Sequence, residues 1–236
     1  MTPSDVSPLL AGGPRNDAPM ALWEVHRSLA IGDRIAADES AVRSWPSDLL
    51  AAVIEGAGFS AVERRRRVWQ RERTLPDTTA GDLRVLLVGL NPSLHSADVG
   101  FGFAGPGNRF WPAALAAGLV TADRDPLEAI TVDRVGMTDL VKRATPRADA
   151  LTSAEYVHGI GRLRVLVEWL RPGVVCIIGL SGWRVAVDRK AVAGLQEQPF
   201  GGRPVYVMPN PSGVNAHATP AVLVDHFRAV LALAPP

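Results

Sequence analysis

One long loop of this sequence gathers two amides, a carboxylate and several aromatic side chains. It lies in VLLVGLNPSLHSADVGFGFAGPGNRFW, residues 85–111, and contains Asn91, Asp98, Phe103 and Asn108. About twenty residues separate the apolar run from the next helical pattern, whereas a usual strand-to-helix connection has about two to six. The segment is too aromatic for a disordered linker, so it predicts a functional loop.

The residue types in this loop suit the binding of a nucleobase. An amide both donates and accepts hydrogen bonds, as the edge of a base requires, and a phenyl ring suits the face of a base. Pro92 makes the backbone next to Asn91 rigid. Structural roles are open as well, because Asn108 could be the N-cap of the following helix and Phe103 could anchor the loop.

A second polar loop, NPSGVNAHATP, follows an apolar run that ends at Met208. In open α/β sheets, ligands bind beyond the carboxyl ends of the strands. If the two loops leave the sheet on the same side, Asn91 and Asn210 form two walls of one site. Neither loop contains a phosphate-binding glycine motif, and GLSGW, residues 179–183, lacks the spacing of a hydrolase nucleophile elbow.

Apolar runs alternate with helical patterns from residue 84 onward, which is typical of a parallel sheet covered on both faces. The runs predict four strands, at 84–90, 133–141, 173–180 and 203–209. Helical patterns lie at 109–117, 153–170, 182–192 and 219–233. The predicted fold class is α/β, a three-layer α/β/α sandwich with a central, mainly parallel four-stranded sheet.

The first 80 residues show a different pattern. Residues 1–19 are rich in Pro, Gly, Asp and Ser and predict a flexible tail. Residues 20–80 predict a mostly helical extension, with helical spacing in 21–35 and 47–59. The domain that carries both polar loops is expected over residues 81–236.

An arginine-rich segment ends this extension. Six arginines lie in ERRRRVWQRER, residues 63–73. A cluster of this kind can contact phosphates. It can equally be a solvated face with arginine stems over Trp69. The formal net charge of the chain is +1, which gives no general argument for nucleic acid.

Composition excludes several function classes. The chain has 236 residues, 47% of them hydrophobic, no apolar window long enough to span a membrane and no signal-peptide pattern at its start. We expect a soluble, cytoplasmic, monomeric protein. Cys176 sits in an apolar run and the five histidines are scattered, so no zinc or iron–sulfur ligand set is predicted. Only a carboxylate magnesium site stays open.

The two loops together resemble the two motifs of the mismatch-specific uracil/thymine-DNA glycosylases, the Mug/TDG family. GLNPSLHSADVGFGFAGPGNRFW is similar to their first motif, GINPG followed by a Gly/Phe-rich stretch and a GPGNxFW-like end. MPNPSGVNAH is similar to their second motif, the intercalation loop. The resemblance runs from Arg84 to the C-terminus. It implies an α/β/α sandwich that hydrolyses the N-glycosidic bond of uracil or thymine in duplex DNA, especially opposite guanine.

The reaction implied by this resemblance needs a flipped base and a water nucleophile. Asn91 takes the place of the family's catalytic asparagine, which positions the water. Leu90, Phe103 and Asn108 are expected at the base, with Phe103 stacked on it. An amide cannot remove a proton at neutral pH, so catalysis by Asn91 alone should depend on a good leaving group.

The resemblance places the second loop on the DNA. Val214 is expected to be the wedge that enters the base stack, although an ordinary loop valine is the structural alternative. The DNA-contacting residues around it are Asn210, Pro211, Ser212, Gly213 and Asn215. Asn215 and Ala216 stand where relatives often carry Ser or Ala followed by Arg, which predicts a weaker grip, and His217 is a partial substitute.

Two residues of the first loop depart from the family pattern. Ser93 replaces the last glycine of GINPG, and Asp98 stands in a stretch where family members generally carry no acid. Asp98 lies seven residues after Asn91 and could act as a base on the water or stabilise positive charge on the sugar. A turn or capping role is the alternative. We therefore predict two catalytic residues, Asn91 and Asp98.

The predicted function is that of a monofunctional glycosylase that removes uracil, and related pyrimidine lesions, from mismatched double-stranded DNA without metal or organic cofactor. Neither motif contains a lysine for a Schiff base, so the expected product is an abasic site. Two alternatives stay open. One is a related glycosylase branch that acts on single-stranded uracil-DNA, and the other is a non-catalytic nucleobase-binding module.

Overall fold

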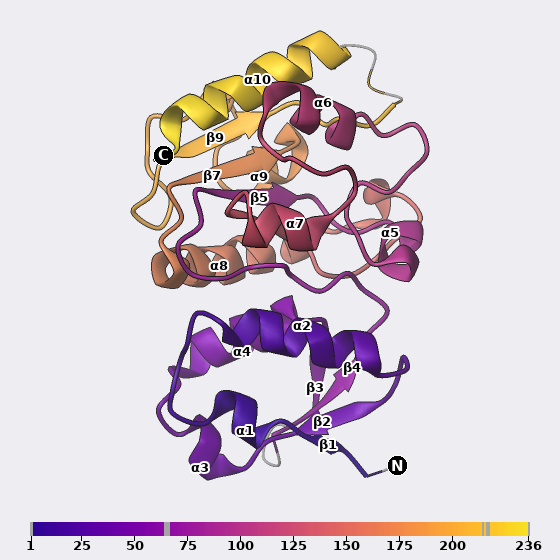
Figure 1. Cartoon of the computed structure of the whole chain (residues 1–236), viewed down its shortest axis with the longest axis vertical. Coiled ribbons are helices and arrows are strands. Elements are labelled where there is room, and N and C mark those ends of the chain that lie inside the picture. Colours follow the sequence, from indigo (N-terminus) through magenta and orange to yellow (C-terminus); the bar gives the residue numbers. More distant parts are fainter. Residues whose placement is uncertain (1, 64–66, 214, 216–217, 236) are drawn as a thin grey trace.

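The computed structural model describes residues 2–63, 67–213, 215 and 218–235. An N-terminal unit, residues 2–71, lies below an α/β domain, residues 79–235, in Figure 1, and residues 72–78 form the linker between them. The N-terminal unit contains β1 (Ser4–Asp5), α1 (Ser7–Leu10), α2 (Ala18–Ser28), β2 (Arg34–Ala36), α3 (Glu39–Val42), α4 (Ser47–Gly56), β3 (Phe59–Glu63) and β4 (Val68–Arg71).

The α/β domain alternates strands with helices, as the apolar runs predict. Its elements are β5 (Val85–Gly89), α5 (Leu94–Val99), α6 (Phe110–Ala117), α7 (Pro126–Thr131), β6 (Val135–Asp139), a 3-10 turn (Ala148–Ala150), α8 (Ser153–Leu170), β7 (Val174–Ile178), α9 (Leu180–Ala186), β8 (Gly194–Leu195), β9 (Val205–Met208) and α10 (Pro220–Leu233).

A five-stranded sheet in the order β6-β5-β7-β9-β8 forms the centre of this domain. The four predicted strands pair in parallel, and the two-residue β8 adds an antiparallel edge that the sequence did not indicate. Side chains of β5 alternate between two cores, since Val85 and Leu87 point to one face and Leu86 and Val88 to the other. This alternation is the period of a strand buried on both faces.

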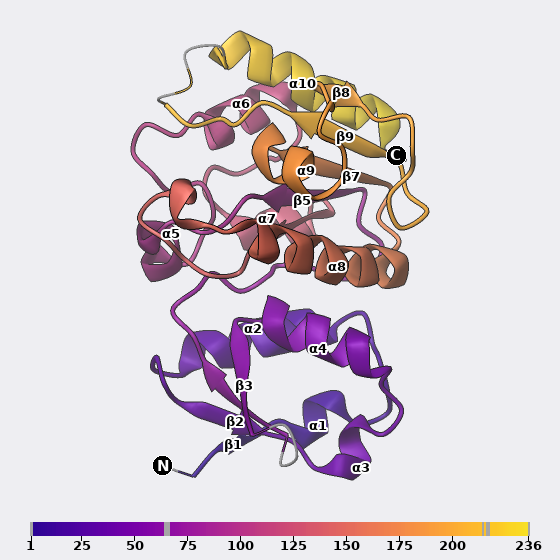
Figure 2. The ribbon, with the colours of Figure 1, turned by 180° about the vertical axis from the view of Figure 1, so that it is seen from behind.

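Helices cover both faces of the sheet, which confirms the three-layer α/β/α sandwich. α6 and α10 lie on one face, and α8 and α9 lie on the other (Figures 1 and 2). Phe110 and Phe227 anchor the first core, and Leu163 and Trp183 belong to the second. No helix in the described part of the chain is both long and apolar enough to cross a membrane.

The N-terminal unit differs from its prediction. It holds a four-stranded sheet, in the order β1-β2-β4-β3, so it is mixed α/β rather than mostly helical. The predicted flexible tail is structured, because β1 pairs with β2 and the side chains of Val6 and Leu10 are 1% and 0% exposed. These short strands obtain their hydrogen-bond partners from distant parts of the chain, which local periodicity does not reveal.

The long loop after β5 also contains structure of its own. Ser93 caps α5, with its Oγ accepting a hydrogen bond of 3.0 Å from the Ser96 backbone N–H. Ser93, the departure from the family pattern, therefore starts a helix where the sequence analysis expected an irregular loop. Conversely, the helix predicted over 182–192 is the shorter α9.

The two units are in contact through helices. α4 of the N-terminal unit packs against α8 of the α/β domain. At the edge of this contact, His158 Nε2 lies 2.9 Å from a carboxylate oxygen of Glu55. The linker also adds to the sheet, because Thr78 forms an antiparallel bridge with Met137 of β6. The bridge thus attaches the start of the α/β domain to β6, the edge strand of the sheet.

Candidate active site

A pocket of ≈ 230 Å³ opens beyond the carboxyl ends of β5, β6, β7 and β9. We call it the base pocket. It brings together six residues predicted from the sequence, which are Leu90, Asn91, Phe103, Asn108, Asn210 and Ser212. The two polar loops therefore face one site, as the position of both loops after parallel strands suggested.

The amide of Asn91 is held in one orientation. Its Nδ2 donates to the carbonyl oxygens of Pro92 and Arg143, both at 3.1 Å, and to Thr145 Oγ1 at 2.7 Å. The Thr145 hydroxyl in turn donates to the Arg147 carbonyl, so it can only accept from Asn91. Among the described residues nothing donates to Asn91 Oδ1, which leaves this oxygen able to accept a hydrogen bond from a water in the pocket.

Phe103 and Asn108 form another side of the base pocket. The Phe103 ring stacks on Phe110, with ring centroids 4.1 Å apart, and its backbone adopts a left-handed φ of 59°. Asn108 Oδ1 accepts a hydrogen bond of 2.9 Å from the N–H of Phe110, the first residue of α6, whose N-cap is Arg109. Asn108 Nδ2 has no partner among the described residues and is available as a donor to a ligand.

Hydrogen bonds stabilise the second loop internally and connect it to the first loop. Asn210 Oδ1 accepts from the Ser212 N–H at 3.0 Å, and Asn215 Nδ2 donates to the Asn210 carbonyl at 2.9 Å. The Pro211 carbonyl accepts from the Arg109 N–H, and Gly213 lies against Gly107. Val214, the predicted wedge, lies outside the described residues, as do Ala216 and His217.

Arg109 fastens the two loops together, a role that the sequence analysis missed. Its guanidinium donates to the carbonyl oxygens of Asn215 and Ala218, at 3.1 and 2.8 Å, and of Gly213, at 3.2 Å. Arg109 stands at the start of α6, directly after the glycine-rich stretch. One arginine thus positions the backbone of the second loop relative to the first.

A buried carboxylate, Asp139, completes the base pocket. It is the last residue of β6, and its carboxylate accepts no hydrogen bond from the described residues. A β-carbon at Gly89 would collide with its Oδ1, which explains a glycine at the end of β5. Burial raises the pKa of Asp139 to about 6, so it is mainly ionised at neutral pH.

The pocket can be compared with known protein families at this point. A family model of the uracil DNA glycosylase superfamily matches residues 76–232. The chain belongs to the uracil-DNA glycosylase superfamily. The match covers the whole five-stranded sheet and both polar loops, and it begins within the linker. The narrower resemblance to the mismatch-specific branch stays a prediction.

Membership of the uracil-DNA glycosylase superfamily gives the site its chemistry. The protein is a DNA glycosylase, a hydrolase of base excision repair that acts on uracil-type lesions in DNA. Hydrolysis of an N-glycosidic bond needs a site that holds the base and directs a water to the sugar carbon. The base pocket offers amides for the edge of the base, an aromatic wall at Phe103 and an ionised carboxylate at Asp139.

Asp98 of this glycosylase does not lie where a general base for the hydrolytic water was predicted. It lies on α5, and its side chain is 49% exposed. Both carboxylate oxygens are held by Arg73 of the linker, at 2.9 and 2.6 Å, and this hydrogen-bonded pairing lowers the pKa of Asp98. The assignment of Asp98 as a base is therefore corrected, because the helical turn begun by Ser93 directs it to the linker instead of the base pocket.

We expect the Asp98→Ala variant of the glycosylase to retain uracil release within about threefold of wild type, because Asp98 does not line the base pocket. Its exposed ion pair with Arg73 contributes only about 0–1 kcal/mol to the stability of the fold. Single-turnover release from a G:U duplex measures this. Arg73→Ala removes the other half of the pair and should behave in the same way. A loss of about 100-fold in Asp98→Ala alone would restore Asp98 as the base.

The arginine-rich segment is partly committed to contacts within the glycosylase. Arg71 Nε donates to the His26 carbonyl at 2.7 Å, and Arg73 pairs with Asp98. Arg67 and Arg73 line a groove of ≈ 820 Å³ between the N-terminal unit and the α/β domain, whose other wall includes Arg143. Residues 64–66, three of the six arginines, lie outside the described part of the chain.

A buried ion network lies behind Asp139. Asp77 of the linker is 3% exposed and pairs with Lys142 at 2.6 Å and with Arg162 of α8 at 2.9 Å. Thr138 Oγ1 donates to the same carboxylate at 2.7 Å. Arg162 also donates to the Asp139 carbonyl at 2.5 Å. The network therefore connects the backbone of Asp139 to the linker and to α8.

The Asp77→Ala variant should lose about 3–5 kcal/mol of unfolding free energy, because removing one partner of a buried pair leaves two uncompensated cations. Urea denaturation at neutral pH measures the change. Asp123→Ala is the matched control, since its pair with Arg124 is about half exposed and should contribute less than about 1 kcal/mol. Equal losses in both variants would contradict a structural role of the network.

Proposed function

We propose that the chain is a monofunctional, mismatch-specific uracil-DNA glycosylase of double-stranded DNA. The observation that carries the proposal is the presence of Asn91 and Asp139 in one pocket at adjacent strand ends. One residue offers a fixed acceptor oxygen and the other an ionised carboxylate. A hydrolytic water held by both would face the sugar of a nucleotide whose base fills the pocket.

The two residues divide the activation of water. Asn91 Oδ1 accepts a hydrogen bond from the water, since Nδ2 is occupied by three acceptors. Asp139 takes the proton as the bond to the sugar forms, or stabilises the positive charge on an oxocarbenium-like sugar. A carboxylate with a pKa of about 6 is suited to this step near neutral pH, which an amide cannot perform.

The departing base needs hydrogen-bond donors for its negative charge. Asn108 Nδ2 is such a donor, because the amide oxygen of Asn108 accepts from the Phe110 N–H. Asn210 is oriented in the same way by the Ser212 N–H. Both residues line the base pocket. Phe103 supplies the aromatic wall against which the ring of the base lies.

The positions of the lysines support hydrolysis without strand cleavage. The chain contains two lysines, Lys142 and Lys190. The Lys142 ammonium is engaged by Asp77 and by the Leu75 carbonyl, and Lys190 lies in the exposed turn after α9. A Schiff-base mechanism needs a free amine at the sugar, so water is the nucleophile and the product is an abasic site.

The test of this proposal is a comparison of substrates under single turnover. Labelled G:U, A:U and G:T duplexes and single-stranded uracil-DNA are incubated with excess enzyme without added metal. The mismatch-specific function predicts the fastest release from G:U. Preferred release from single-stranded DNA would assign the chain to another branch of the superfamily, and binding without release from any substrate would assign it a non-catalytic role.

A further inference from the structure

The groove between the N-terminal unit and the α/β domain adjoins the base pocket. We call it the interunit groove. Thr74 and Ala144 line this groove, and the residues that follow them, Leu75 and Thr145, line the base pocket. One residue spans about 3.8 Å, which is close to the rise of about 3.4 Å per nucleotide in a DNA strand. A strand whose damaged nucleotide occupies the base pocket can therefore continue into the interunit groove.

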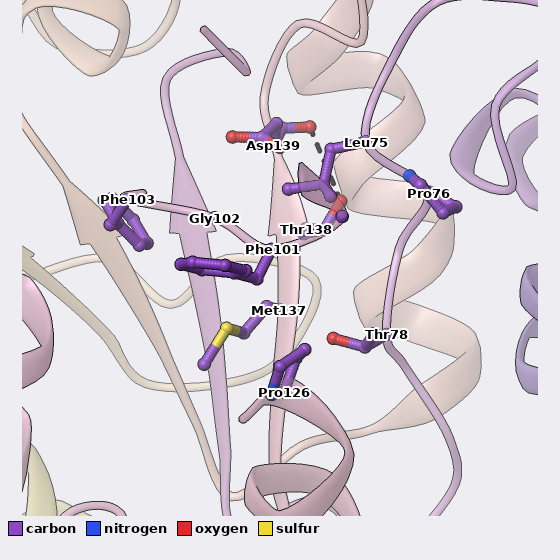
Figure 3. A pocket seen from close by; sticks show the side chains of 11 residues that line it. Leu75, Pro76, Thr78, Phe101, Gly102, Phe103, Pro126, Met137, Thr138 and Asp139 are labelled. Atoms are coloured by element: carbon purple, nitrogen blue, oxygen red, sulfur yellow. Dashed lines mark hydrogen bonds between the residues drawn. The ribbon is translucent and has the colours of Figure 1, made fainter. Parts of the chain in front are cut away.

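Hydrogen bonds fix the wall that the two sites share. Lys142 Nζ donates to the Leu75 carbonyl at 2.5 Å, and Thr74 Oγ1 donates to the Lys142 carbonyl. Figure 3 shows Leu75 near Asp139 at the end of β6, where both line a small cavity of ≈ 20 Å³. The linker thus holds the interunit groove in a fixed position beside the carboxylate of the base pocket.

Three arginines line the interunit groove with donors to spare. The Arg67 guanidinium has no hydrogen-bond or ion-pair partner among the described residues. Arg73 and Arg143 bind Asp98 and Glu155 through Nε and Nη2. In the part of the chain that the structure describes, their Nη1 groups donate to nothing. Each of the three guanidinium groups can therefore donate to a phosphate, the anion that suits its planar geometry.

The charge of the groove lining is positive on balance. Lys142 and the three arginines line it, against two acids, Glu55 and Glu72. Glu55 is already engaged, because its carboxylate lies 2.9 Å from His158 Nε2. The four residues between β3 and β4, 64–67, are all arginine in the sequence, and Arg67 is the one that the structure describes. A DNA backbone, with one negative charge per nucleotide, is the occupant that complements this lining.

We propose that the interunit groove binds the phosphate backbone of the uracil-containing strand next to the damaged nucleotide, with Arg67 and Arg73 as phosphate contacts. The N-terminal unit, which lies outside the superfamily match of residues 76–232, is then a second DNA-binding surface of the enzyme. Arg73 can exchange Asp98 for a phosphate at little cost, because an exposed ion pair contributes little to stability. The proposal needs an enzyme that binds DNA and does not depend on its preference for a mismatch.

The test is the salt dependence of DNA binding by the full chain, measured by fluorescence anisotropy between about 50 and 200 mM salt. The uracil nucleotide of the duplex carries a 2′-fluorine, which slows base release by destabilising positive charge on the sugar. Loss of one phosphate contact should reduce the slope of log K against log salt by about 0.9 in magnitude. Arg67→Ala and Arg73→Ala should each show this reduction.

Each variant has a matched control. Arg34→Ala removes an exposed arginine on β2 of the same unit that does not line the interunit groove, so it should keep the wild-type slope. Asp98→Ala breaks the same ion pair as Arg73→Ala but leaves the arginine in place, so its slope should not fall. An unchanged slope in Arg67→Ala, as expected if the groove binds a protein segment instead, would overturn the proposal. Equal falls in Arg67→Ala and Arg34→Ala, or in Arg73→Ala and Asp98→Ala, would also overturn it.

Uracil release at saturating enzyme separates this proposal from the proposed function. Arg67→Ala should release uracil at the wild-type rate once the DNA is bound, because Arg67 does not line the base pocket. A slower release by the bound variant would contradict a role confined to phosphate binding. Absent release by the wild type, with the difference in salt slope intact, would refute the proposed function alone.

Discussion

Asp139→Asn should lower single-turnover uracil release by about 10²–10⁴-fold, the usual contribution of a positioned general base. The substitution keeps the shape of the side chain and removes its charge, so the base pocket stays intact. Wild-type activity should rise with pH through about 6, as the Asp139 carboxyl ionises, and then level off. The variant should lack this inflection. Rates measured from pH 4.5 to 8.5 on a G:U duplex test both expectations.

Stability measurements distinguish this effect from unfolding. The pKa of Asp139 is raised in the folded protein, so ionisation of this group destabilises the fold as the pH rises from the unfolded pKa toward about 6. Asp139→Asn should therefore increase Tm at pH 7 while activity falls. Asp133→Asn is the matched control, because Asp133 is a buried carboxyl that binds Thr121 away from the pocket. A fully active Asp139→Asn variant would contradict its role as base.

Asn91→Ala should reduce uracil release by about 10²–10³-fold, the usual effect of removing one preorganised polar group from a reacting centre. The variant loses the acceptor that holds the water but keeps Asp139. Affinity for G:U DNA, measured by fluorescence anisotropy, should change little, because Arg109 still holds the second loop. The loss should appear in the rate of the chemical step.

Thr145→Val separates the presence of the Asn91 amide from its orientation. It removes the 2.7 Å hydrogen bond to Nδ2 and leaves the amide in place. We expect a smaller loss than in Asn91→Ala, since the Pro92 and Arg143 carbonyls still accept from Nδ2. Equal activity of Asn91→Ala and wild type would show that the water is held by other groups.

The sequence allowed the α/β domain to be predicted better than the N-terminal unit. Continuous apolar runs and a capped helix such as Thr152 to Leu170 are local signals, and they matched β5, β6, β7, β9 and α8. The N-terminal strands depend on partners far along the chain, such as Ser4 with Ile35. Pairing of this kind has little local signature, so propensity favoured helices there.

Some of the site residues were predicted from the sequence and others were missed, for a related reason. Asn91 and Asn210 follow apolar runs that end in unusual polar loops, and the rule for parallel sheets selected them. Asp139 satisfies the same rule, but the apolar run predicted a strand over 133–141, whereas β6 ends at Asp139, so the prediction placed this residue inside the strand instead of at its end. Asp98 was predicted to be catalytic because it lies seven residues after Asn91. That prediction did not take account of the helix that begins after Ser93 and turns Asp98 away from the pocket. Leu75 lies in the linker, where only the tertiary structure brings it to the pocket.

The most direct test of the glycosylase function is product analysis after single-turnover incubation of the wild-type chain with a G:U duplex labelled in the uracil and on the strand, without added metal. The function predicts free uracil and an unbroken strand that breaks only on later alkaline treatment, as an abasic site requires. DNA that stays intact after alkaline treatment, although the protein binds it, would contradict the proposed function.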